Sequence, residues 1–229
     1  MNVMAPLYTV DIFGYHMGSG VVTQWGVMIF LIIVLSILGT KLKSKGKPTK
    51  LQACLEMVYE GMESLVSGNM GKSFSGYVPF VGTLAIYLGI LNLCGLIGFG
   101  PPTRNISVVI GFTVITFVLV HYNAIKFKGF GHYLGGYLNG GVLMLPINIM
   151  EKIVFPLSLA LRLFGNMLAA AIVMSLIYSG LGHISRVFQF VIPIIPHAYF
   201  DLFDGVIQTV IFLMLTIITI KLESQAEEV

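Results

Sequence analysis

Five long apolar segments constrain this chain more than any other feature of its sequence. Three of them, residues 21–39, 78–99 and 106–125, are 19 to 22 residues long. About 20 apolar residues in a helix cross the hydrocarbon core of a bilayer, which is about 30 Å thick. The mean hydropathy of +0.91 and the low charged fraction of 10% agree with this interpretation. We therefore expect three transmembrane helices here and an all-α integral membrane protein.

The other two apolar segments, residues 142–181 and 187–220, are too long for a perpendicular crossing. A helix of 34 to 40 residues measures about 50–60 Å at a rise of 1.5 Å per residue. Each segment also contains two prolines, which are Pro146 and Pro156 in the first and Pro193 and Pro196 in the second. Because proline removes a backbone donor, we expect these two helices to tilt steeply, bend or break.

The basic residues predict the topology. Six of the thirteen lysines and arginines lie in one short stretch, as Lys41, Lys43, Lys45, Lys47, Lys50 and Lys72. The positive-inside rule places this loop in the cytoplasm. The first 20 residues hold no lysine or arginine, so they are expected outside and lack the basic region of a cleaved secretory signal. These features favour a bacterial plasma membrane over an energy-transducing organelle membrane, and five crossings place the carboxyl end inside.

We expect one polytopic membrane domain over residues 1–229. Its predicted parts are an outer amino-terminal segment (1–20), three spans with a cytoplasmic loop (21–125), a glycine-rich interfacial loop (126–141) and a pair of long tilted helices forming an ion path (142–229). The stretch 49–66 is mixed in polarity, with Glu56, Glu60 and Glu63 at helical spacing. It predicts an amphipathic helix at the inner membrane interface.

Arg162 is the strongest functional signal, because apolar residues flank it on both sides. A charge near the middle of a bilayer costs at least about 2.5–3.5 kcal/mol, so it indicates a partner or a hydrated path. The alternative is that the side chain snorkels to the interface. Glu151, Ser158 and Asn166 lie eleven and four residues before Arg162 and four after it, which places all four on one helix face.

The last long segment carries a second polar stripe, formed at steps of four, three and four residues by His197, Asp201, Asp204 and Gln208. Such a stripe cannot face lipid. The carboxylates and the imidazole are titratable and within reach of one another, so they can pass protons along hydrated steps. The alternative is that His197 and Asp201 lie at the membrane surface and cap a helix. Gln208 is predicted to be a hydrogen-bonding partner.

Other classes of function find less support. Cys54 and Cys94 lack a C-x-x-C spacing, so we expect no metal site, disulfide or cofactor. The lysine run has no interleaved aromatic residues, which disfavours nucleic-acid binding. The chain has no H-E-x-x-H or G-x-S-x-G motif of an intramembrane hydrolase. An ion-coupled secondary transporter remains the alternative, although we find no internal repeat. Asn92 either lines a path or packs.

The motifs of the chain resemble those of subunit a of the F-type ATP synthase over nearly its whole length. The resemblance runs from KPTKLQACLE at residues 47–56 through NLCGLIGFGPPT at 92–103. Its most specific part is SLALRLFGN at 158–166, followed about forty residues later by IQTVIFLMLTI at 207–217. A lone arginine in a membrane helix would be weak support, whereas these two motifs together are strong.

The resemblance implies a mechanism. In this family an arginine, matched by Arg162, faces a carboxylate on a ring of c subunits, and two aqueous half-channels lead ions to and from that carboxylate. Asn166, Gln208 and Glu151 match polar positions of the family. The implied partners are the c-ring, the peripheral-stalk b subunits, the rest of the complex and membrane lipid. The implied ion is H⁺, with Na⁺ as a possibility, and the chain is expected not to be an enzyme by itself.

The chain departs from the family pattern at several polar positions. Ala170 and Ala171 stand where well-known members carry Gly-Glu or Gly-His, and Asp201 stands where they carry His or Glu. Asn105 stands where many members have Asp. We therefore expect Asp201 and Asp204 to take over the acidic role in the half-channel.

Overall fold

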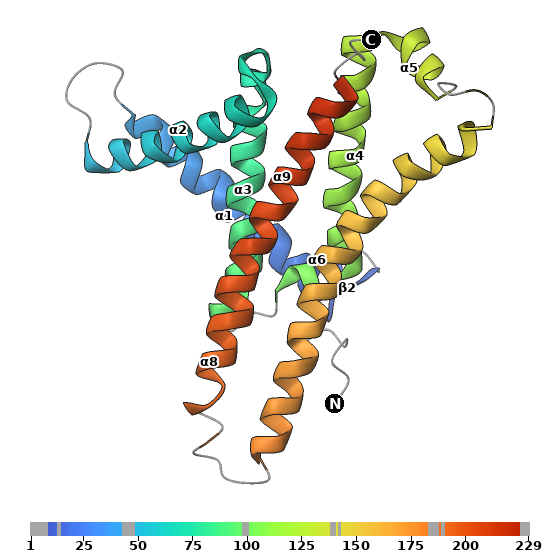
Figure 1. The fold of residues 1–229 in the computed structure, drawn as a ribbon. Coiled ribbons are helices and arrows are strands. Elements are labelled where there is room, and N and C mark those ends of the chain that lie inside the picture. Colours follow the sequence, from blue (N-terminus) through green and yellow to red (C-terminus); the bar gives the residue numbers. More distant parts are fainter. Residues whose placement is uncertain are drawn as a thin grey trace.

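The computed structural model describes residues 9–12, 15–42, 49–97, 101–137, 141, 143–182, 188 and 191–224. Helices dominate this part of the chain (Figure 1). Five of them are long and apolar enough to cross a membrane, over Ser19–Thr40, Lys72–Leu96, Ile106–Lys128, Leu145–Gly182 and Ile194–Ser224. The prediction of an all-α integral membrane protein with five membrane helices is therefore confirmed.

The first three predicted crossings correspond to α1 (Ser19–Lys41), α3 (Val78–Leu93) and α4 (Ile106–Lys128). The side chain of Asn105 caps α4, because its oxygen accepts a hydrogen bond from the backbone N–H of Ser107 at 3.0 Å. Gly129 ends α4 with a φ of 79°, a left-handed conformation that glycine adopts without steric cost. Local sequence signals thus set both ends of α4.

The predicted amphipathic helix is α2 (Lys50–Met70), which runs across the end of the helix bundle (Figure 1). The side chain of Thr49 accepts a hydrogen bond from the N–H of Gln52 at 3.3 Å and caps the helix. Val66 and Met70 are buried near the carboxyl end of α2. The helix extends four residues beyond the predicted segment 49–66, because this last turn packs into the core.

Several short elements were not expected from the sequence. An antiparallel hairpin of β1 (Thr9–Ile12) and β2 (Tyr15–Gly18) precedes α1. The helix α5 (Phe130–Gly136) lies within the segment predicted to be a glycine-rich loop. Short 3₁₀ turns are η1 (Lys72–Tyr77), η2 (Cys94–Ile97) and η3 (Pro102–Arg104). Elements of three to seven residues are too short for hydrophobic periodicity to reveal them.

The two long segments differ from each other in continuity. The helix α6 (Leu145–Gly182) has 38 residues and continues through Pro156 without a break. The final segment is divided into α8 (Ile194–His197), η4 (Ala198–Asp204), which is a π-helix, and α9 (Gly205–Ser224). The predicted break is thus confirmed after Pro193, whereas α6 does not break but changes direction along its length (Figure 1). Wider π turns of this kind often occur at functional sites.

The core of the molecule lies around α9, which packs against α3 and α4. Side chains of α2, α3, α4, α6 and α9 form one buried apolar cluster, with Leu88, Leu91, Leu163, Ile217 and Ile220 among its most buried members. The apolar surface of α1 is exposed and lies at the periphery. An exposed apolar helix suits a lipid environment or a membrane-embedded partner.

One end of the bundle carries α2, α5, the start of α6 and the last turn of α9 (Figure 1). We name it the inner end, because the lysines of these elements gather there and the positive-inside rule assigns such an end to the cytoplasm. The outer end carries α8 and the carboxyl end of α6. The chain therefore alternates between the two ends as the sequence predicts.

Candidate functional site

Arg162 lies near the middle of α6, 17 residues after Leu145 and 20 before Gly182. At 1.5 Å per residue both ends of the helix are about 25–30 Å away. The Arg162 side chain is exposed, and with Val154, Leu157, Ser158 and Leu161 it lines a shallow groove on the surface of α6. Within the described part of the chain, no acidic side chain forms an ion pair with Arg162. The distance from Arg162 to either end of the helix exceeds the reach of an arginine side chain, so snorkelling to either end is disfavoured.

The structure divides the predicted polar face of α6 into two places. Ser158 and Arg162 share the groove, and Asn166 is half-buried one turn further on. Glu151 lies at the inner end instead, in a pocket shared with α5 and α9. The opposite face of α6 carries Leu159 and Leu163, which are buried in the core. The apolar face therefore directs the polar face outward.

The polar stripe of the last segment is mostly buried. Gln208 on α9 and Asp201 on η4 are 4% and 8% exposed, and Asp204 is half-buried. Thr209, next to Gln208, is buried as well. A buried carboxylate or amide needs hydrogen-bonding partners, and the outer end of the molecule supplies them for Asp201.

At the outer end, His197 bridges a phenol and a carboxylate. Its Nδ1 lies 2.6 Å from Asp201 Oδ2 and its Nε2 lies 3.1 Å from the hydroxyl of Tyr178 on α6. A neutral imidazole has one donor and one acceptor nitrogen, so it can hydrogen-bond on both sides at once. The capping alternative is not supported for His197, whose side chain makes no capping hydrogen bond to η4. This interaction connects α6 with the final segment.

Two glycines let the final segment approach η2 and α3 closely. A Cβ on Gly95 would lie 2.8 Å from Asp201 Oδ1, and a Cβ on Gly205 would lie 3.3 Å from the Cβ of Asn92. The amide nitrogen of Asn92 donates to Gly205 O at 3.3 Å and to Thr209 Oγ1 at 3.1 Å. The buried Asn92 Oδ1 has no hydrogen-bond partner in the described structure. This oxygen is thus an available acceptor at the contact between α3 and α9.

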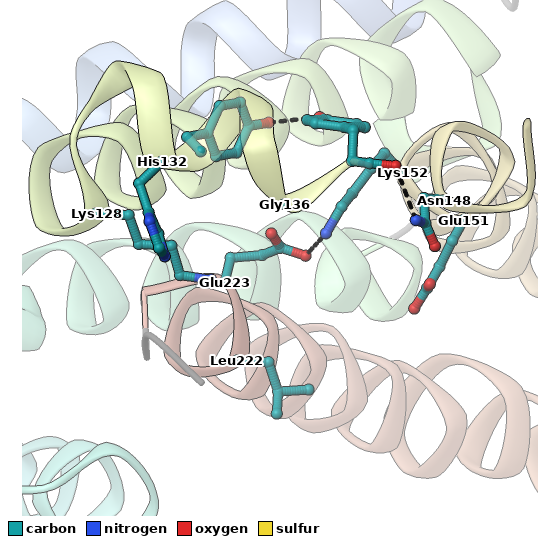
Figure 2. A pocket seen from close by; sticks show the side chains of 10 residues that line it. Lys128, His132, Gly136, Asn148, Glu151, Lys152, Leu222 and Glu223 are labelled. Carbon is teal, nitrogen blue, oxygen red and sulfur yellow. Dashed lines mark hydrogen bonds and ion pairs between the residues drawn. The ribbon is translucent and has the colours of Figure 1, made fainter. Parts of the chain in front are cut away.

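The inner end holds a polar pocket of about 220 Å³ between α5, α6 and α9 (Figure 2). Lys152 on α6 forms an ion pair with Glu223 on α9 beside this pocket. The Tyr133 hydroxyl lies 2.8 Å from His121 Nδ1 and 2.6 Å from the Tyr137 hydroxyl. Burial, followed by the hydrogen bond with Tyr137, raises the pKa of the Tyr133 phenol well above its ordinary value. The phenol therefore keeps its proton and serves as a neutral wall of the pocket.

Sequence reasoning missed several of these residues. Tyr178, Gly95, Lys152 and Glu223 carry no pattern that distinguishes them from ordinary membrane-protein residues. A polar Asn92 within an apolar segment was the available signal for the contact between α3 and α9, and the sequence left its role open. Lys152 stands beside Glu151, but the sequence does not show that it pairs with a residue 71 positions away.

These features define a class of protein. Five apolar helices, ionisable groups at both ends of the α6–α9 pair and an exposed cation at the middle of α6 are those of a multi-pass membrane protein that translocates ions. The comparison with protein families then gives the particular family. A family model described as "ATP synthase A chain" matches residues 21–221. The chain belongs to the ATP synthase subunit a family, so it is a membrane-sector, ion-translocating component of the ATP synthase complex.

Individual relatives cover most of the chain. ATP synthase subunit a of Albidiferax ferrireducens is 32% identical over 205 residues, which span 89% of this chain and 85% of the relative. The subunit from Geobacter sp. strain M21 is 35% identical over 207 residues, spanning 89% and 86%. The sodium ion specific subunit a of Propionigenium modestum is 28% identical over 226 residues, spanning 92% and 75%.

Proposed function

We propose that this chain carries ions through two offset half-channels that meet at Arg162 against a ring of c subunits. The observation that carries the proposal is an exposed arginine at the middle of a membrane helix without an acidic partner in the described chain. A charge facing lipid there would cost at least about 2.5–3.5 kcal/mol. A carboxylate on the neighbouring ring removes this cost and explains the groove around Arg162.

The outer half-channel runs along the polar cluster of the final segment. His197 and Asp201 accept ions at the outer end, and Asp204 lies further along the same segment toward the membrane middle. Hydrogen-bonded imidazole and carboxylate groups pass protons in short steps. Asn92, with its unused carbonyl oxygen, provides an acceptor for a protonated group or a water molecule in this path.

The inner half-channel opens through the pocket that contains Glu151. Arg162 separates the two halves, because a fixed positive charge repels cations that would pass directly and favours the ionised form of a passing ring carboxylate. Arginine suits this role because it stays protonated even when partly desolvated. The ion must therefore travel with the ring, and about 2.3 kcal/mol per charge per 100 mV becomes available for rotation.

Asn166 and Gln208 are uncharged neighbours of this path. Gln208 is buried on α9, and its amide offers both donors and an acceptor to polar groups opposite. We infer that both amides hydrate and orient the arginine and the ring carboxylate. In this role they support the ion path without taking up the ion.

The proposed partners are the c-ring, the b subunits of the peripheral stalk and membrane lipid. We place the chain in a bacterial plasma membrane, because the reported relatives are bacterial. Residues 1–229 act as one membrane domain, and the chemistry of ATP belongs to other subunits. The transported ion is H⁺ in our proposal, with Na⁺ as the alternative, since one relative is named sodium ion specific.

Replacement of the arginine tests this function. Arg162→Ala is expected to abolish ion-driven ATP synthesis in reconstituted vesicles while the complex still assembles, because the apolar helix still inserts. Lys72→Ala is the matched control, since it removes an exposed cation remote from the groove. Copurification in mild detergent should recover a ring of small hairpin subunits with either variant. Sustained synthesis by Arg162→Ala, or solute transport by the purified chain alone, would contradict the proposal.

A further inference from the structure

Glu151 and Lys152 are neighbours in sequence with opposite charges, and their side chains point in different directions at the inner pocket. The side chain of Lys152 turns toward α9 and pairs with Glu223, whereas the Glu151 carboxylate points away from this pair (Figure 2). Glu151 is exposed and lines the pocket. Within the described chain it makes no ion pair or side-chain hydrogen bond. Glu151 is thus a carboxylate without an ion-pair partner in the described chain, at the pocket of the inner end.

The pairing of Lys152 matters because of where its ammonium group would otherwise lie. A lysine side chain is long and flexible, so an unpaired Lys152 ammonium group could move toward the Glu151 carboxylate, which lines the same pocket. An opposite charge within about 4–6 Å stabilises a carboxylate in its ionised form and competes for it with any other cation. An ion leaving the ring would then meet an occupied acceptor.

The net charge of the side chains that line the pocket depends on each single charged group. The titratable or charged side chains that line it are Lys128, His132, Tyr133, Tyr137, Glu151, Lys152 and Glu223. With the histidine neutral, the two lysines balance the two glutamates. Removal of the Glu223 charge leaves one excess positive charge and an unpaired ammonium group, and both disfavour a cation in the pocket.

We propose that Glu223 is a positioning residue for ion translocation, which holds the Lys152 ammonium group away from Glu151 and so keeps Glu151 free to exchange ions at the inner opening. The inference rests on the proposed function, since it takes Glu151 as the inner group of the ion path. It predicts that loss of the Glu223 charge impairs ion translocation, whereas loss of the Lys152 charge does not. A simple tether between α6 and α9 would make both losses equivalent.

The test compares three variants in the complete complex reconstituted into vesicles. Glu223→Gln is expected to reduce ion-driven ATP synthesis roughly fivefold or more and to raise the inner-side ion concentration needed for half-maximal ATP-driven pumping. Lys152→Met is expected to stay within about twofold of the unmodified complex, because it removes the interfering cation. The double variant Lys152→Met/Glu223→Gln is expected to recover most of the activity lost in Glu223→Gln. Assembly is measured by the amount of chain in the purified complex.

The outcomes separate this inference from the proposed function. Equal losses in both single variants with no recovery in the double variant would show a tether and overturn the inference, while Arg162→Ala still tests the ion path. If Glu223→Gln does not assemble, the double variant decides: assembly with recovered synthesis supports the inference, and failure overturns it. Unaltered synthesis and pumping in Glu223→Gln would also overturn it.

Discussion

At Gly95 the carboxylate of Asp201 occupies the space in which any other residue would place its Cβ. The same carboxylate forms a short hydrogen bond with His197. Because Gly95 on η2 has no Cβ, the Asp201 side chain on η4 can take this position. The outer cluster depends on this close approach as much as on the polar residues themselves.

Gly95→Ala is expected to displace the Asp201 carboxylate, because the new Cβ would lie 2.8 Å from its Oδ1. The contact with His197 would loosen, and we expect ion-driven ATP synthesis to fall about tenfold, which corresponds to about 1.4 kcal/mol. Gly89→Ala is the matched control, since a Cβ there meets no atom within 4 Å. Equal activity of the two variants would contradict the importance of this contact.

Asp201→Asn and Asp204→Asn test the relay itself at the residue scale. An amide has nearly the shape of a carboxylate but does not take up a proton, so both variants are expected to slow ion uptake at the outer end. The measurement is the pH dependence of ATP-driven pumping and of ion-driven synthesis. If both variants show the pH dependence of the unmodified complex, these carboxylates do not form the relay.

At the scale of elements, the last turn of α9 connects two other helices. The Lys221 ammonium group donates to the carbonyl of Asn69 at the carboxyl end of α2, at 2.8 Å. Glu223, two residues later, pairs with Lys152 of α6. A cation at a helix carboxyl end also interacts favourably with the helix dipole. One turn of α9 thus organises the inner end of the bundle.

Lys221→Met should weaken the attachment of α2. Loss of a charged hydrogen bond and of its interaction with the helix end costs about 1–2 kcal/mol. We expect the apparent Tm of the detergent-solubilised complex to fall by about 2–4 °C per kcal/mol. Lys72→Met, a change at an exposed lysine near the end of α2, is the control and is expected to leave the Tm unchanged. A similar Tm in both variants would exclude this role of Lys221.

At the scale of the whole molecule, the two faces of α6 have different surroundings. Leu161 is 53% exposed beside Arg162, whereas Leu163 is 1% exposed within the core. The proposed function places the c-ring against the face that carries Leu161. In the proposed complex, the c-ring therefore covers the face of α6 that is exposed in the single chain.

Cysteine cross-linking measures this orientation in the complex. In a background with Cys54→Ser and Cys94→Ser, Leu161→Cys is expected to cross-link with cysteines on the outer helices of the c-ring. Leu163→Cys, on the opposite face of the same helix, is expected not to cross-link. The products are detected by their size on denaturing gels. Cross-linking of Leu163→Cys in place of Leu161→Cys would exclude the proposed docking face.

Much of this architecture follows from local patterns in the sequence. Hydropathy predicts the membrane helices, and the spacing of three glutamates predicts α2, because each depends on residues close together in the chain. The same periodicity places Ser158 and Arg162 on one face of α6. It also identifies the polar stripe from His197 to Gln208. The membrane class and the candidate residues of the ion path are therefore readable without tertiary structure.

The contacts that arrange these residues depend on segments far apart in sequence. Asn92 and Thr209 are separated by 117 positions, and Lys152 and Glu223 by 71. The close fit of Asp201 against Gly95 likewise depends on how η4 packs on η2. Hydrophobic patterning specifies which face of a helix is buried but not which residue of another helix it meets. The sequence by itself thus determined the membrane helices and their polar faces, whereas the tertiary packing decided which charges are paired and which remain free.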